Sequence, residues 1–131
     1  MEELDLLQHT TYNVELINKN KELFKMLFDK IASTYKLFSV TDRSERNIRQ
    51  VSFAPTESRI QNVFITIKPN GEFGIVFVGR HDKMESLKGD YETSKYTHDT
   101  RLRIEGITTE NYLKHIPTIV KAIEYCDYSF K

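Results

Sequence analysis

Two histidine–aspartate pairs stand close together in the segment RHDKMESLKGDYETSKYTHDTR, which spans residues 80–101. The pairs are His81-Asp82 and His98-Asp99, and both residue types can ligate metals or transfer protons. Metal ligation needs several ligands on rigid elements, and neither pair has HxH or HExxH spacing. The pattern therefore predicts ordinary loop-edge residues, with the aspartates stabilising turns, and it predicts neither a metal nor a cofactor.

Nucleophilic and phosphate-binding chemistry is also unsupported. Cys126 is expected to be a buried thiol at the end of the last helix. His115 shares a four-residue spacing with Ile119 and is expected to pack against the core rather than act as a base. The five glycines form neither GxGxxG nor a Walker pattern, and no serine has the flanking glycines of GxSxG.

A metal-dependent nuclease is the nearest enzyme class. Such a core needs carboxylates and commonly a lysine beside them. Asp42 and the sequence Glu57-Ser58-Arg59 come closest, but arginine replaces the lysine and Pro55 disrupts the expected strand. We therefore expect no enzymatic activity and keep a degenerate nuclease as the second alternative.

The same segment interleaves cations with aromatic side chains. Charge for phosphates and rings for bases are what a single-stranded nucleic acid requires, although Asp90, Glu92, Asp99 and Glu105 interrupt the pattern. A surface of mixed charge suits a protein partner equally well. We expect protein contact, with nucleic acid as the alternative. The candidate partner-binding residues are Arg80, Lys88, Tyr91, Lys95, Tyr96, Arg101 and Arg103.

Composition places these residues in one domain. The chain has 131 residues, 19 basic and 19 acidic side chains, and one cysteine. A dedicated DNA-binding protein usually has a basic excess, which is absent here. The beginning of the sequence shows no signal peptide, and no stretch reaches the ~20 apolar residues of a membrane span. A single cysteine agrees with a reducing environment, so we expect a cytoplasmic protein without membrane contact.

Hydrophobic periodicity predicts the elements that position the segment. Residues 1–12 are a leader, and residues 13–131 form the domain. A helix is expected over 20–35, with a start as early as Val14. Strands are expected over 35–41, 48–54, 60–68, 72–79 and 100–106, and Asn-Gly at 70–71 predicts a hairpin. The strand over 72–79 is apolar on both faces, so it should be central and covered twice, by a second helix or by a homodimer.

The last third of the chain completes the prediction. Residues 80–99 are expected to be a long polar connection, and such connections are often functional. Thr108 or Thr109 should cap a final helix whose apolar stripe is Leu113, Ile116, Val120 and Ile123. In the strand before it, Leu102 and Ile104 should point inward and Arg101 and Arg103 outward. The fold class is α+β: a mainly antiparallel sheet of four or five strands flanked by an N-terminal and a C-terminal helix.

The order of these features is similar to a known family. A strand FGIVFVG, a loop containing Leu-Lys-Gly-Asp, a strand HDTRLRI and a helix ending IVKAIEY follow one another, and HTTYNVELINKNKELFKMLFDKI precedes them. Over roughly residues 9–126 this resembles a bacterial domain-of-unknown-function family sometimes labelled "predicted transport protein". Its members occur alone or beside or fused to restriction-type nucleases. The segment RNIRQVSFAP departs from the aromatic and lysine-rich sequence usual there.

The resemblance implies an accessory α+β domain in a restriction, phage-defence or anti-defence context, and it carries over no catalytic residue. Combined with the residue patterns, it predicts a non-enzymatic binding module that contacts a protein. A nucleic-acid-binding accessory domain of a restriction-type nuclease is the alternative.

Overall fold

The computed structural model describes residues 14–43, 48–68 and 71–126. The expected leader over 1–12 lies outside these residues. The described chain is α+β, with three helices and six strands. In chain order these are α1 (Val14–Ala32), β1 (Lys36–Arg43), β2 (Ile48–Ala54), β3 (Val63–Ile67), β4 (Phe73–Gly79), α2 (His81–Ser86), β5 (Glu92–Lys95), β6 (Thr100–Ile107) and α3 (Tyr112–Tyr125). Among the described residues, no helix is long and apolar enough to cross a membrane.

All six strands belong to one antiparallel sheet with the order β1-β2-β3-β4-β6-β5. The predicted hairpin between β3 and β4 is present, with Ile65 opposite Ile75 and Val63 opposite Phe77. Its turn includes residues 69–70, which lie outside the described residues. Every residue of β4 is buried, and the strand lies between β3 and β6. The prediction of a central strand is therefore confirmed.

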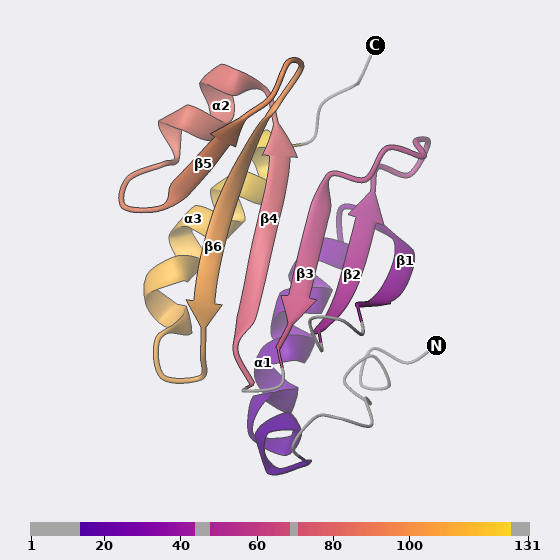
Figure 1. Ribbon diagram of the computed structural model, residues 1–131, viewed down its shortest axis with the longest axis vertical. Coiled ribbons are helices and arrows are strands. Elements are labelled where there is room, and N and C mark those ends of the chain that lie inside the picture. Colours follow the sequence, from indigo (N-terminus) through magenta and orange to yellow (C-terminus); the bar gives the residue numbers. More distant parts are fainter. Residues whose placement is uncertain (1–13, 44–47, 69–70, 127–131) are drawn as a thin grey trace.

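The two long helices cover the same face of the sheet. In Figure 1, α1 lies behind β2 and β3, and α3 lies behind β4 and β6. Two aromatic contacts fix α1 there: the ring centroids of Phe24 and Phe73 are 5.7 Å apart, and those of Phe28 and Phe53 are 5.4 Å apart. The inward residues of α1, α3 and all the central strands form one core cluster, which supplies most of the burial that stabilises the domain.

Buried polar side chains tie the end of α3 to the rest of the core. The Tyr35 hydroxyl donates to the backbone carbonyl of Ile123. The side-chain amide of Asn62 donates to the carbonyl of Cys126 at 3.0 Å. Both carbonyls belong to the last turn of α3, where backbone acceptors lack helical partners. Cys126 is buried, as the sequence predicts.

The prediction of a structureless connection over 80–99 is wrong. This segment forms helix α2 and the edge strand β5, which pairs antiparallel with β6. Met84 gives α2 an apolar anchor with no exposed surface. The absence of a side chain at Gly79 makes room for it, since a Cβ there would lie 2.9 Å from the Met84 methyl carbon. One buried residue in six is too sparse a pattern to predict a helix.

Two predictions about α3 also need correction. Thr108 and Thr109 do not cap the helix, because Asn111 is its N-cap residue. The apolar stripe is rotated: Leu113 is 72% exposed and Val120 is 48% exposed. The residues that face the core are His115, Ile119, Ala122 and Ile123. The core-facing position in the first turns of α3 is therefore occupied by His115, whereas the hydrophobic pattern alone predicts Leu113. The expectation that His115 packs against the core is confirmed.

Candidate contact surface

The face of the sheet opposite α1 and α3, called here the outer face, has no described helix over it (Figure 1). On β4 it carries Val76 and Val78, which are only 9% and 3% exposed. Their cross-strand neighbours on β6 are Arg103 and Arg101 respectively. Neighbouring side chains on one sheet face lie side by side, and long cations bury their stems. These arginines therefore cover the valines on the face where the sequence predicts a second helix or a homodimer.

Arg101 and Arg103 point outward as predicted, since Leu102 and Ile104 between and beside them are fully buried. β5 and the residue that follows it bring further side chains beside them. The Tyr96 ring lies 4.6 Å from the guanidinium carbon of Arg101, which is a cation–π contact. The Nε of Arg103 donates to the Ser94 hydroxyl at 3.4 Å. We call Ser94, Tyr96, Arg101 and Arg103 the outer corner.

The neighbouring carboxylates are arranged unevenly around this outer corner. Glu105, the next outward residue of β6, forms an ion pair with Lys68 on the far side of β4 at 3.6 Å. It can reach across because Gly74 lies beneath it, where a Cβ would come within 2.6 Å of its carboxylate oxygen. Glu92 lies opposite Arg103 in the register, yet no ion pair joins these two described residues.

Two polar atoms near the outer corner are buried without a hydrogen-bond partner among the described residues. They are the Nε of Arg101 and the Oδ1 of Asp99. The main chain of Asp99 closes the β5–β6 turn by accepting a hydrogen bond from the Tyr96 amide at 2.8 Å. The turn therefore holds Tyr96 in position against Arg101, and it leaves buried polar groups whose hydrogen bonds are not satisfied locally.

Tyr91 does not join the outer corner. Its hydroxyl forms a hydrogen bond with Nδ1 of His115 at 2.7 Å, and the two rings lie 5.6 Å apart. This contact connects the α2–β5 loop to α3 beneath the sheet. Burial lowers the pKa of His115, and the adjacent Lys114 lowers it further. Both effects disfavour a charged imidazole.

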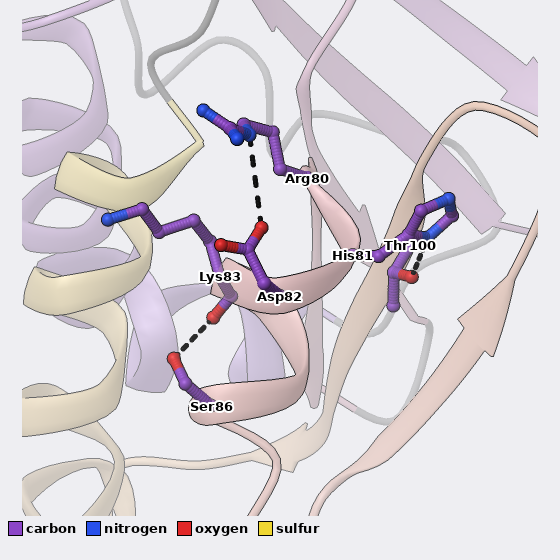
Figure 2. A network of polar contacts seen from close by, with 6 residues as sticks. All are labelled: Arg80, His81, Asp82, Lys83, Ser86 and Thr100. Atoms are coloured by element: carbon purple, nitrogen blue, oxygen red, sulfur yellow. Dashed lines mark hydrogen bonds and ion pairs between the residues drawn. The ribbon is translucent and has the colours of Figure 1, made fainter.

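The remaining candidate cations lie around α2 and β5 without forming one cluster. Lys88 and Lys95 are exposed. Arg80 precedes α2, and its Nε lies 3.8 Å from the Asp82 carboxylate. Figure 2 shows this pair on one side of α2. Of the seven residues predicted to bind a partner, the structure brings three together on one face: Tyr96, Arg101 and Arg103.

The two His-Asp pairs lie at the start of α2 and in the β5–β6 turn, and their histidines differ in their contacts. His81 points away from Asp82, and its Nδ1 lies 2.7 Å from the Thr100 hydroxyl (Figure 2). His98 is exposed in the β5–β6 turn. Among the described residues, no three His, Cys, Asp or Glu side chains come close enough to hold a metal ion together.

For the residues of the nuclease alternative, the structure gives only the position of each in the chain and in the sheet. Glu57 is exposed in the connection between β2 and β3. Asp42 lies in β1 opposite Arg49, and its side chain is outside the described set.

Sequence reasoning missed Ser94 and Lys68 as parts of this surface. The signal was present for Ser94: Glu92, Ser94 and Tyr96 alternate with the period of a strand, directly before the arginine pair. Lys68 could not be found this way, because its contact with Glu105 crosses β4 and depends on the strand order.

Comparisons with known proteins add no relative: neither the protein-family models, nor the curated proteins, nor the solved structures contain a match to this chain. The resemblance to a domain-of-unknown-function family stays a prediction from the sequence.

Proposed function

We propose that this protein is a non-enzymatic binding module that contacts a protein partner through the outer corner of its sheet. The observation that carries this proposal is the pair of arginines on the outer face. Neither Arg101 nor Arg103 forms an ion pair with another described residue, although acidic side chains lie nearby. A partly buried cation without an anionic partner loses hydration without recovering it locally, which favours an anionic group from outside the domain.

The surroundings of the arginines favour a protein over a nucleic acid. Tyr96 is 46% exposed and combines a large apolar ring with a polar tip, as residues at protein interfaces commonly do. Glu92 lies opposite Arg103 in the register, and Asp99 comes two residues before Arg101, so these two carboxylates balance the formal charge of the two arginines. A phosphate backbone would meet these carboxylates unfavourably, whereas a protein surface can supply both signs of charge.

The sequence resemblance supports a restriction, phage-defence or anti-defence context for the partner, in the cytoplasm. A nucleic-acid-binding accessory domain is the second candidate, favoured by the stacked Tyr96 and Arg101, because a ring and a cation together suit single-stranded nucleic acid.

Affinity capture from a bacterial lysate, with and without nuclease treatment, tests the proposal. The variant Tyr96→Ala, Arg101→Gln, Arg103→Gln removes the outer corner. The matched control Lys114→Gln, Lys121→Gln removes two exposed cations from α3. We expect a nuclease-resistant partner that the first variant loses and the control retains. Equal capture by both variants would contradict the proposal, and capture that disappears with nuclease would favour nucleic acid.

A further inference from the structure

The two arginines of the outer corner have a spacing that restricts the chemistry of their partner. We infer that the segment bound there is extended and carries two carboxylates two residues apart, as in Asp-x-Asp or Glu-x-Glu. This inference rests on the proposed function and specifies which part of a protein partner the surface recognises.

The donors available to such a segment are the terminal nitrogens of the arginines. The Nε of Arg103 is occupied by the Ser94 hydroxyl, and the Nε of Arg101 is buried. No described residue accepts a hydrogen bond from the Nη atoms of either guanidinium. Each guanidinium can therefore offer its Nη atoms to a carboxylate, the anion whose planar geometry fits an arginine best.

The spacing of the donors comes from the strand that carries them. Arg101 and Arg103 are alternate residues of β6, so their backbone positions lie about 6–7 Å apart on the same face. An extended peptide repeats with the same rise, and its residues i and i+2 also share a face. Carboxylates at i and i+2 of a segment lying along β6 would thus meet both guanidiniums at once, whereas adjacent carboxylates would point to opposite sides.

The character of the surface favours an extended segment over a helix. A docking helix needs an apolar groove or stripe to pack against. Among the described residues beside the arginines, the apolar Val76 and Val78 are buried, and Glu92 and Tyr96 are exposed. An extended acidic segment can bind through charge-assisted hydrogen bonds alone and does not require that groove.

The neighbouring charges limit how much negative charge the surface accepts. Arg101 and Arg103 carry two positive charges, and Glu92 and Asp99 carry two negative ones. Glu105 is already paired with Lys68. Two carboxylates bound to the guanidiniums are paired, but the further charges of a polyanion would meet the exposed Glu92 opposite Arg103. Binding should accordingly weaken only modestly with salt, unlike the steep dependence of nucleic-acid binding.

Titration of the full-length ¹⁵N-labelled protein with synthetic peptides tests this inference by NMR. The probe is a ten-residue peptide of serine and threonine with two aspartates separated by one residue. The control has the same composition with the aspartates adjacent, and a ten-nucleotide oligothymidylate is the third ligand. We expect the spaced peptide to shift amide signals of β5 and β6 and to bind about tenfold more tightly than the control, because only it forms two charge-assisted contacts.

Single variants assign the contacts. Arg101→Gln and Arg103→Gln should each weaken the spaced peptide about tenfold and remove the preference for it, and Lys121→Gln should change neither value. Amide spectra of each variant check that the fold is retained. Equal affinity for the two peptides would overturn the inferred spacing.

Other outcomes separate this inference from the proposed function. If neither peptide binds while the arginine variants still lose a captured protein, the dicarboxylate inference is wrong and the docking surface stands. If oligothymidylate binds most tightly, with an affinity that falls steeply as salt is added, both the dicarboxylate inference and the proposed protein partner are contradicted.

Discussion

The two faces of strand β4 differ in what covers them. Ile75 and Phe77 lie in the core cluster beneath the helices and have no exposed surface. Val76 and Val78, between and beside them, face the outer side, where the long side chains of β6 are their neighbours. One face thus holds the fold together by dense packing, and the other presents polar groups above a thin apolar layer. The difference indicates which substitutions should unfold the protein and which should change only its contacts.

The largest expected effect is the loss of packing on the covered face. Ile75→Ala should lower the free energy of unfolding by about 2–5 kcal/mol, because it leaves a cavity among close-packed neighbours. Val76→Ala removes fewer atoms, and Val76 lies on the outer face with no described helix packed over it. This variant should therefore lower the free energy of unfolding by clearly less than Ile75→Ala. Urea denaturation of both variants measures the two values. Equal losses of unfolding free energy in the two variants would contradict the difference in packing between the two faces.

The buried polar contacts of the covered face should come next. Tyr35→Phe keeps the ring but removes the hydroxyl that donates to the Ile123 carbonyl. Leaving a buried carbonyl without its donor costs about 1–3 kcal/mol. The same denaturation experiment tests this value. An unchanged midpoint would mean that this contact does not hold the end of α3.

The covered face should also make stability depend on pH. The pKa of His115 is lowered in the folded protein by burial and by Lys114. Below about pH 6.5 the unfolded chain therefore binds more protons at this position than the folded one. Stability should be fully present above that pH and should fall as the pH decreases toward the folded pKa.

The variant His115→Gln isolates this contribution. Denaturation at pH 5 and pH 8 should show a smaller pH dependence for the variant than for the natural sequence. The same slope in both proteins would assign the dependence to other groups.

The smallest effects on stability should come from the outer corner. Tyr96→Ala removes a cation–π contact at a partly exposed site and should cost about 0.5–1 kcal/mol. Arg101→Gln removes the same contact and should cost a similar amount. Arg103→Gln should lie within about 0.5 kcal/mol of the natural sequence, as surface substitutions usually do. Thermal unfolding of the three variants measures this. A loss as large as that of Ile75→Ala would show that the corner is structural.

Much of the architecture could be predicted from local sequence patterns. The predictions that were wrong concern elements whose formation depends on tertiary contacts. The strand Ile48–Ala54 has the predicted bounds, and the outward direction of Arg101 and Arg103 follows from simple alternation. α2 and β5 were missed because Met84 alone anchors the helix and because β5 gains its stability from pairing with β6.

The same limit applies to the candidate site. Residues close in sequence between 80 and 103 were expected to act together, but folding divides them between two sides of the sheet. Tyr91 turns beneath it toward His115, and Tyr96 lies above it on Arg101. Alternate residues of a strand face opposite sides of the sheet. Which residues of this segment face which side can therefore be predicted only if β5 is recognised as a strand.

Hydrogen exchange of the full-length protein, alone and with its captured partner, tests the central claim most directly. The account predicts that binding slows amide exchange in β5, β6 and the turn between them, while α3 is unchanged. Slower exchange confined to α1 and α3, with none in β5 and β6, would contradict it and move the contact surface to the helical side of the domain.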